Sequence, residues 1–412
     1  MKIEIDSARL IAEIEDLALI SEAEPPVVTR IVFTPADMRA RAWLIERCEG
    51  AGLAVRRDAI GNTFARWQGA DRDAPVVGTG SHIDAIPNAG KYDGVVGVLG
   101  GLEAIRALRR GGFRPNNSIE LLLLTSEEPT RFGIGCIGSR LLAGTLSPEA
   151  ARKFTDNSGE SVDEVRRAAG LTGELDGVKL AKGYYKAFVE LHIEQGPILE
   201  RERIPLGIVT KIAAPASARV TIEGAGGHAG GVVMPDRHDA LCAAAELILA
   251  IEKAARTSGS ADTVATVGMC DVFPGAVNSI PSRVRISVDV RDTNLAKRDG
   301  VMQAMESAAR EVDSRRGVST QIELVNADAP VECAKEVIEA LTAGCKKHGE
   351  KFMLMISRAY HDSLFLSRIA PVAMLFIPCR NGYSHRPDEY ASIEDISRGA
   401  LVLAETLAVL AS

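Results

Sequence analysis

Apolar runs alternate with amphipathic segments through the first third of the chain. Residues 74–82 form a mostly apolar run typical of a buried strand, and residues 95–112 repeat apolar side chains at helical spacing before two glycines. A second strand-like run opens residues 118–129. Strand, helix and strand in succession predict an α/β domain whose mixed, mostly parallel sheet is flanked by helices.

The pattern changes between residues 211 and 325. The segments there have the order strand, helix, two strands, helix and strand, which is typical of a compact α+β, ferredoxin-like unit. An apolar run at 371–378 again resembles the strands of the first part. We therefore expect one domain formed by residues 1–210 and 326–412, with a second domain inserted at 211–325.

Composition and charge narrow the possible functions. The 412 residues are 46% hydrophobic and 25% charged, as in a globular protein, and the net charge is −7. No block of Lys and Arg occurs, which argues against binding nucleic acid or an anionic membrane. The acidic N-terminus does not resemble a signal peptide, and no apolar run is long enough to span a bilayer. We expect a cytoplasmic protein.

The seven cysteines are scattered, and no C-x-x-C pair occurs. This argues against a disulfide framework and against a cysteine zinc site. Acidic and imidazole side chains, by contrast, gather after several predicted strands, where the carboxyl ends of parallel strands share one edge of a sheet. These residues are His82, Asp84, Asp93, Glu127, Glu128, His192 and His385.

Nitrogen and oxygen ligands of this kind suit Zn²⁺, Mn²⁺ or Co²⁺. Asp93 is the natural carboxylate to bridge two ions, and Asp84 is placed to orient the ring of His82. The adjacent acids Glu127 and Glu128 allow one to bind metal while the other remains a free base. Chemistry alone therefore favours a metal site at this edge of the sheet.

Each motif also has a more ordinary interpretation. A single histidine at a strand end is usually just a hydrogen-bonded polar residue, and Glu127–Glu128 followed by Pro129 could begin a helix. Ser126 and Ser363 lie beside acids or histidine, but no G-x-S-x-G turn is present. The glycine-rich stretch 224–231 lacks the Lys-Ser/Thr ending of a phosphate-binding loop.

Seven motifs, in order between residues 80 and 389, resemble those of the M20-type metal-dependent amidohydrolases. That group includes allantoate amidohydrolase, N-carbamoyl-L-amino-acid hydrolase and ureidoglycolate amidohydrolase. The resemblance implies an aminopeptidase-like catalytic domain with an inserted lid and dimerisation domain. The motifs are GSHIDAIPNAGKYDGVVG, LLTSEEPTRFG, LHIEQGPILE, GAGGHAGG, PGAVNSIP, DVRD and FIPCRNGYSHRPDE.

The resemblance implies two divalent metal ions in each subunit. His82 and His192 match the ligands of one centre, Glu128 and His385 match those of the other, and Asp93 matches the shared ligand. Mn²⁺ is the usual ion of the family, although these ligands also permit Zn²⁺, Co²⁺ or Ni²⁺.

The general base of the family corresponds to Glu127. His228 matches a lid histidine that reaches the active site of the neighbouring subunit in a homodimer. The remaining matched residues are expected to contact substrate, with Asn278 and Arg291 holding its carboxylate. Those that line the pocket in the family's pattern are Gln195, Tyr360 and His361.

The stretch SRAYHDSLF, residues 357–365, most resembles the ureidoglycolate branch of the family. Tyr360 stands where the allantoate and carbamoyl-amino-acid enzymes tend to have glycine. We therefore expect hydrolysis of the terminal ureido C–N bond of a small ureido carboxylate, (S)-ureidoglycolate, to give glyoxylate, ammonia and carbon dioxide. The alternatives are allantoate or an N-carbamoyl-L-amino acid as substrate, a peptidase, or a non-catalytic binding protein on the same fold.

Overall fold

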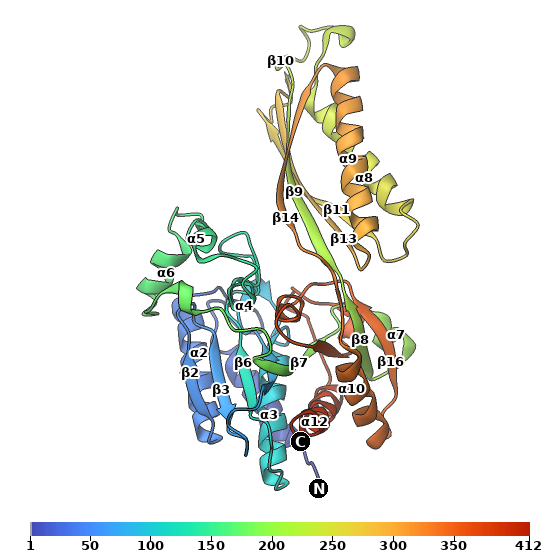
Figure 1. Ribbon diagram of the computed structural model, residues 1–412. Helices are drawn as coiled ribbons and strands as arrows, with labels where there is room; N and C mark the ends of the chain where they lie inside the picture. Colours follow the sequence, from blue (N-terminus) through green and yellow to red (C-terminus); the bar gives the residue numbers. More distant parts are fainter. Residues whose placement is uncertain (1) are drawn as a thin grey trace. The chain divides into compact units, whose positions relative to one another are not determined.

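The computed structural model describes residues 2–412, which form two compact units (Figure 1). The first unit comprises the chain up to Thr210 together with Glu332–Ser357 and His361–Ser412. The second unit comprises Lys211–Val331 and Arg358–Tyr360. Among residues 2–412, no helix is both long and apolar enough to cross a bilayer.

A nine-stranded mixed sheet forms the centre of the first unit. Its strand order is β15-β8-β17-β7-β4-β6-β3-β2, and β16 also pairs with β8. The strands are β2 Ala54–Arg57, β3 Thr63–Trp67, β4 Val76–Ser81, β6 Ile119–Leu123, β7 Tyr185–Ile193, β8 Leu206–Ile212, β15 Val331–Glu332, β16 Phe352–Ser357 and β17 Val372–Ile377.

The four central strands β17, β7, β4 and β6 are parallel to one another, and β3 and β2 extend the sheet in antiparallel fashion. Strands β4, β6 and β17 are fully buried, because helices and loops cover both faces of a central parallel sheet. The register places Ser81, the last residue of β4, beside Leu123, the last residue of β6. The carboxyl ends of the central strands therefore meet at one edge.

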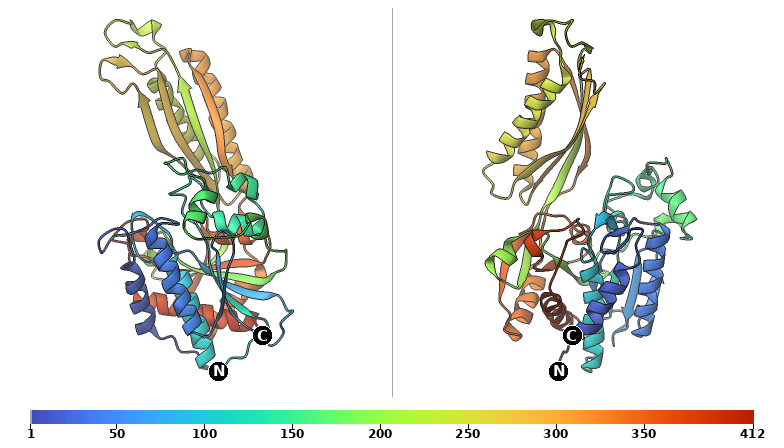
Figure 2. Two further views of the ribbon diagram at one scale, coloured as in Figure 1. Left: turned by 90° about the vertical axis from the view of Figure 1, so that its left-hand side faces the viewer. Right: turned by 180° about the vertical axis from the view of Figure 1, so that it is seen from behind.

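Helices pack against this sheet and against one another (Figure 2). The long helices α3 Val95–Arg110 and α12 Ile393–Leu410 contact each other and the central strands. Gly97 of α3 permits this close packing, since a Cβ there would lie 2.4 Å from the carbonyl oxygen of Leu191. The other helices are α1 Ser7–Ala18, α2 Pro35–Gly50, α4 Ile137–Ala143, α5 Pro148–Ala151, α6 Val162–Ala168, α7 Ile198–Glu202, α10 Lys335–Lys347 and α11 Asp362–Leu366.

The second unit is a four-stranded antiparallel sheet with two helices on one face (Figures 1 and 2). Its core lies between the sheet and the helices and includes Val220, Ile286 and Leu247. The segments have the order expected from the sequence, with one short additional pair, β10 and β12. The elements are β9 Ala214–Glu223, β10 Gly227–His228, α8 Ala240–Arg256, β11 Val264–Phe273, β12 Ser279–Ile280, β13 Arg283–Asp292, α9 Leu295–Arg316 and β14 Ser319–Ala327.

The sequence pattern and the structure differ at three places. The glycine-rich residues 81–97 predict a loop, whereas the structure has strand β5 Ala85–Ala89 there, paired with β1 Val28–Arg30. Pro235 predicts the start of a helix, but the helix begins at Ala240, because the Asp239 side chain accepts from the Leu241 and Cys242 backbone N–H groups and caps it there. No helix starts at Glu127–Glu128; the next one begins at Ile137.

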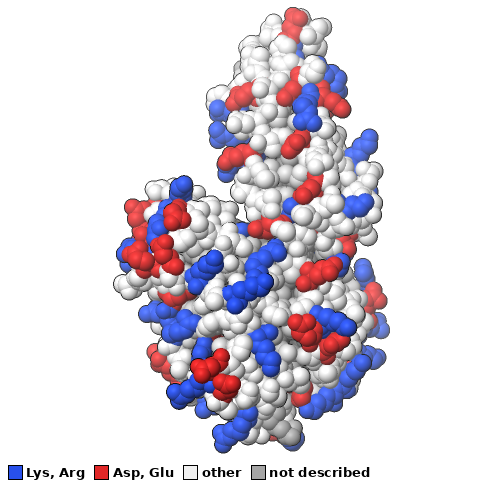
Figure 3. All heavy atoms as spheres, viewed as in Figure 1, with Lys and Arg blue, Asp and Glu red and all other residues white. Residues whose placement is uncertain are grey.

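Acidic and basic side chains are intermingled on the face shown in Figure 3. This mixture reflects the near balance of 48 Lys and Arg against 55 Asp and Glu residues.

Candidate metal centre and active site

Two histidines at neighbouring strand ends present the same ring atom to one carboxylate. His82 follows β4, and His192 is the penultimate residue of β7. Each Nδ1 lies at hydrogen-bond distance from a backbone carbonyl oxygen, at 3.0 Å for His82 and 2.9 Å for His192. Because a carbonyl oxygen only accepts, Nδ1 carries the proton in each ring. Nε2 is therefore the ring atom that faces Asp93 Oδ1, at 3.6 Å in His82 and 3.1 Å in His192.

Asp93 faces a second group of ligand atoms through its other oxygen. His385 Nε2 lies 3.2 Å from Asp93 Oδ2 and 3.2 Å from Glu128 Oε1. In each of the two groups, His82–Asp93–His192 and Asp93–Glu128–His385, the potential ligand atoms lie within 4.8 Å of one another. One carboxylate thus belongs to both groups and directs one oxygen toward each.

The electrostatics of this centre favour a cation. Burial alone would raise the pKa of Asp93, but hydrogen bonds from His192, His385 and His82 outweigh it and hold that pKa well below the ordinary value. Burial lowers the pKa of His82, yet Glu127 and Asp93 raise it well above its usual range. A proton and a cation therefore compete for the same ring nitrogen, and a bound cation would displace the proton.

Glu127 belongs to neither ligand group and lies beside them. Its Oε2 is 3.7 Å from His82 Nε2, and the side chain is only 9% exposed. Burial raises the pKa of Glu127 well above normal, and the nearby Glu128 charge adds to this effect. A carboxylate with a raised pKa next to a water-activating site is suited to accept and return a proton.

Asp84 has a different contact from the one expected. The ring of His82 donates to the backbone oxygen of Asp84, whereas the Asp84 carboxylate is 3.8 Å from that ring nitrogen. The carboxylate instead accepts the backbone N–H groups of Glu127 at 3.4 Å and Glu128 at 3.1 Å. Burial raises the pKa of Asp84 to about 6. Asp84 therefore holds the acidic turn as well as the histidine.

Gln195 and His361 also lie at this centre. Gln195 Nε2 donates to Asp93 Oδ2 at 2.7 Å, and its buried Oε1 has no hydrogen-bond partner within the part of the chain that the structure describes. The His361 ring packs edge-on against His192, with ring centroids 4.6 Å apart. The first unit thus brings together all of its predicted site residues, namely His82, Asp84, Asp93, Glu127, Glu128, His192, Gln195, His361 and His385.

The second unit carries the other four predicted residues, in two places. His228 in β10 pairs in register with Ser279, and the backbone carbonyl oxygen of Asn278 accepts from the Ala229 N–H at 2.8 Å. This pair follows the carboxyl end of β9, in which Glu223 pairs with Arg283.

Arg291 lies at the opposite end of the same sheet, since it pairs with Pro215 near the start of β9. Its guanidinium lies 5.8 Å from the centre of the Tyr360 ring and donates to Asp289 at 2.7 Å. The ten residues of β9 span roughly 30 Å. The structure therefore brings His228 close to Asn278, and Arg291 close to Tyr360, but separates the two pairs.

The sequence model of Peptidase family M20/M25/M40 matches residues 78–409. The chain belongs to this family. It is 51% identical to a ureidoglycolate hydrolase of Oryza sativa subsp. japonica over 98% of this chain and 85% of that protein. An N-carbamoyl-L-amino-acid amidohydrolase of Pseudomonas sp. is 37% identical, over 98% of both chains. The family assignment and the fold expected from the sequence are both confirmed.

Solved structures of related chains agree with this assignment. The crystal structure of AtUAH in complex with glyoxylate is 49% identical, has a TM-score of 0.92 and is matched over 99% of this chain and 98% of that one. The complex of AtUAH with (S)-hydroxyglycine gives the same values. Members of the M20 family are metal-dependent hydrolases, and the two ligand groups around Asp93 provide the nitrogen and oxygen donors that such an ion requires.

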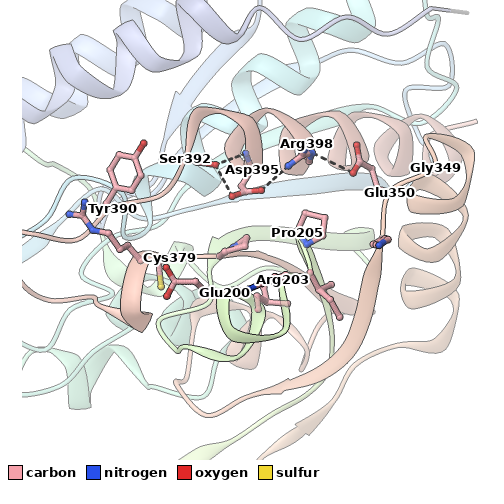
Figure 4. A pocket seen from close by; sticks show the side chains of 15 residues that line it. Glu200, Arg203, Pro205, Gly349, Glu350, Cys379, Tyr390, Ser392, Asp395 and Arg398 are labelled. Carbon is pink, nitrogen blue, oxygen red and sulfur yellow. Dashed lines mark hydrogen bonds and ion pairs between the residues drawn. The ribbon is translucent and has the colours of Figure 1, made fainter.

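A separate cavity of about 550 Å³ lies in the first unit (Figure 4). Cys379 and Tyr390 line it, and Arg398 on its wall pairs with Glu350 and Asp395. None of the predicted metal ligands lines this cavity.

Sequence reasoning missed several side chains around the centre. The Cys136 thiol lies 3.7 Å from Glu127 Oε1, and burial raises its pKa well above normal, so it remains a neutral donor. Ser384 Oγ is 2.6 Å from Asp93 Oδ2, and Glu389 accepts the Asp93 N–H at 3.1 Å. For Ser384 and Glu389 the only signal in the sequence is proximity to His385, because their partner Asp93 lies almost 300 positions away.

Proposed function

We propose that this chain hydrolyses the terminal ureido C–N bond of a small ureido carboxylate, and that its substrate is (S)-ureidoglycolate. Water and the ureido group give ammonia and a carbamate. The carbamate loses carbon dioxide to leave hydroxyglycine, which releases a second ammonia to form glyoxylate. The observation that carries the proposal is the shared carboxylate Asp93 between two ligand groups, with the unshared acid Glu127 beside it.

In this proposal His82 and His192 would hold one ion, Glu128 and His385 would hold a second, and Asp93 would be a ligand shared between them. We propose Mn²⁺ as the ion. When bound, such ions lower the pKa of water and polarise a carbonyl group. Glu127 takes a proton from the attacking water and delivers it to the departing nitrogen. Asp84 keeps Glu127 and Glu128 in place through their backbone N–H groups.

Substrate binding requires residues of the second unit. Arg291 offers a planar pair of donors that fits a carboxylate, and the neighbouring Tyr360 ring limits the size of what binds there. His228 donates to the oxyanion that develops on the ureido carbonyl oxygen. Asn278 lies beside His228 and contributes a further amide.

We propose that the enzyme is a homodimer in which His228 and Asn278 act on the substrate bound by the neighbouring subunit. The support is the separation within the second unit, because residues at opposite ends of a strand roughly 30 Å long cannot both contact a substrate of a few ångströms. In a twofold symmetric dimer, each subunit provides its His228 and Asn278 to the site of its partner. Each site then contains both this pair and the pair Arg291 and Tyr360.

The test is ammonia release from three substrates, (S)-ureidoglycolate, allantoate and an N-carbamoyl-L-amino acid, with Mn²⁺ present. The 51% and 50% identities to ureidoglycolate hydrolases of two plants, against 37% to the carbamoylase, favour the first substrate. We expect its kcat/KM to be the highest of the three. If (S)-ureidoglycolate is the slowest, the substrate assignment is wrong, and if none reacts, the enzymatic proposal itself is wrong.

A further inference from the structure

Glu389 is a buried carboxylate outside both ligand groups that accepts hydrogen bonds from the turn that carries Asp93. Glu389 lies between β17 and α12 and is 4% exposed. Its Oε1 accepts the backbone N–H of Tyr92 at 2.8 Å and that of Asp93 at 3.1 Å. These two donors belong to a segment almost 300 residues earlier in the chain, so Glu389 joins two parts of the centre that local sequence does not connect.

The second oxygen of Glu389 reaches the other side of the same centre. Ser384 Oγ lies 2.8 Å from Glu389 Oε2 and 2.6 Å from Asp93 Oδ2, and Ser384 immediately precedes His385. A hydroxyl has one proton, so Ser384 donates to one of the two carboxylates at a time. In either orientation the Ser384 hydroxyl lies between Asp93 and Glu389 and connects them to the segment that carries His385.

Packing around Glu389 leaves this arrangement little freedom. A Cβ at Gly90 would lie 2.4 Å from Glu389 Cβ, so only glycine allows the two segments to approach this closely. The next residue, Tyr390, packs its ring edge-on against Tyr92, with centroids 6.0 Å apart. Figure 4 shows Tyr390 on the wall of the adjoining cavity, so this residue and Glu389 present their side chains to different surroundings.

His385 itself needs such support. Its φ of 59° lies in the left-handed region, which residues with a side chain adopt only when their surroundings hold them there. Arg380 and Arg386 both contact Asp388 within this segment, whereas Ser384 and Glu389 connect it to Asp93.

We propose that Glu389 is a positioning residue that sets the spacing of Asp93 and His385, and so the affinity for the ion on the His385 side of the centre. This inference rests on the two-ion site of the proposed function. Carboxylate oxygens only accept hydrogen bonds, and here they receive two backbone N–H groups and a hydroxyl. Side chains that orient metal ligands in this way typically account for ~10–100-fold in metal affinity.

The experiment is a calorimetric titration of the full-length, metal-free protein with Mn²⁺. The step that His385→Ala abolishes identifies the ion on the His385 side. We expect Glu389→Ala to raise the Kd of that step ~10–100-fold and to change the other step much less. Glu389→Gln keeps an oxygen for the two N–H groups, so its Kd should lie between those of Glu389→Ala and the unaltered protein.

Two further variants keep the test decisive. Ser384→Ala should raise the Kd of the same step by a smaller factor. If Glu389→Ala does not fold, Ser384→Ala and Glu389→Gln together provide the test. Glu405→Gln is the matched control, because Glu405 is also a buried acid but pairs with Lys347 and His348 instead. It should leave both Kd values unchanged.

The outcomes separate this inference from the proposed function. If the unaltered protein binds two Mn²⁺ ions and folded Glu389→Ala and Ser384→Ala bind both with unchanged Kd, the positioning role is refuted while the metal site stands. Equal weakening of both steps also refutes it, since that would reflect general loosening. If the unaltered protein binds fewer than two ions, the two-ion proposal fails, and the inference fails with it.

Discussion

The two units arrange their chemical groups in contrasting ways. In the first unit, side chains that follow four different strands lie around one carboxylate at the carboxyl edge of a parallel sheet, and most of them are buried. In the second unit, Arg291 lies at one end of the four-stranded sheet, and His228 lies in the separate β10–β12 pair that follows the other end of β9 and is exposed. The first unit can hold its reactive groups without help, whereas the second cannot gather its groups around a single ligand.

The difference follows from the topology of each sheet. Parallel strands joined by crossover helices bring every carboxyl end to the same edge, so loops after β4, β6, β7 and β17 meet there. Antiparallel strands run alternately in both directions, so the ends of successive strands lie on opposite sides. In the proposed function, the first unit carries the reacting groups, and the binding of substrate depends on the assembly of two subunits.

Removal of metal should have the largest effect, because it removes the chemistry of the first unit altogether. Treatment with a chelator followed by desalting should abolish ammonia release from (S)-ureidoglycolate. Added Mn²⁺ should restore it, as expected for ligands that lose protons on binding metal. The measurements are ammonia release and elemental analysis of the same samples. Equal rates before and after complete metal removal would contradict a metal-dependent mechanism.

Loss of Glu127 should separate metal binding from catalysis within the first unit. Glu127 lies outside both ligand groups. We therefore expect Glu127→Gln to retain the metal content of the unaltered protein and to lose ~10²–10⁴-fold in kcat, the usual contribution of a general base. Elemental analysis and steady-state kinetics provide the two readouts. A variant with normal kcat would remove Glu127 from the mechanism, and a variant without metal would make it a ligand.

Local sequence predicted the elements of the first unit that carry their own signal. The runs that became β4, β6 and β17 are apolar and short, and the residues that follow them are acidic or imidazole, so the edge of the sheet could be recognised as a metal site. The strand β5 could not be predicted, because its partner β1 lies about 55 residues away and the pairing leaves no local pattern.

The same limit applies to Glu389 and to the second unit. Glu389 looks like an ordinary acid in the sequence Pro387–Asp388–Glu389, and only the folded chain places it against Tyr92 and Asp93. Arg291 and Tyr360 are 69 positions apart, and their contact could not be inferred from either segment alone. Interactions between distant segments are therefore the part of the site that sequence patterns did not reveal.

Variants of the second unit should test its dependence on a partner. His228→Ala should lower kcat ~10²–10³-fold if this residue stabilises the oxyanion. Arg291→Ala should act mainly on KM, so the activities of the mixtures are compared at a substrate concentration well below KM. If each site combines His228 of one subunit with Arg291 of the other, a mixed dimer of the two variants has one intact site. Random mixing of equal amounts should then restore about a quarter of the original activity, since half of the dimers are mixed and each has one working site of two.

The control for this mixing is a doubly substituted chain combined with the unaltered protein in the same ratio. In those mixed dimers each site lacks one of the two groups, so only the unaltered homodimers should contribute, again about a quarter of the original activity. The two experiments differ before mixing, because the unaltered protein is active on its own, whereas neither single variant has an intact site. If mixing the single variants restores nothing although subunits exchange, His228 and Arg291 act within one subunit and the proposed division of the second unit is wrong.

Substitution of Tyr360 should have the smallest effect, because it changes which substrate fits and leaves the reacting groups in place. The Tyr360 ring lies 5.8 Å from the guanidinium carbon of Arg291, so it occupies space beside the proposed carboxylate site. We expect Tyr360→Gly to shift the kcat/KM ratio toward an N-carbamoyl-L-amino acid on the order of 10-fold, as filling or emptying a small volume in a pocket does. Tyr360→Phe keeps the ring and should shift that ratio less. Competition between the two substrates in one reaction measures the ratio directly, and an equal shift in both variants would assign the selectivity to the phenolic hydroxyl and not to the bulk of the ring.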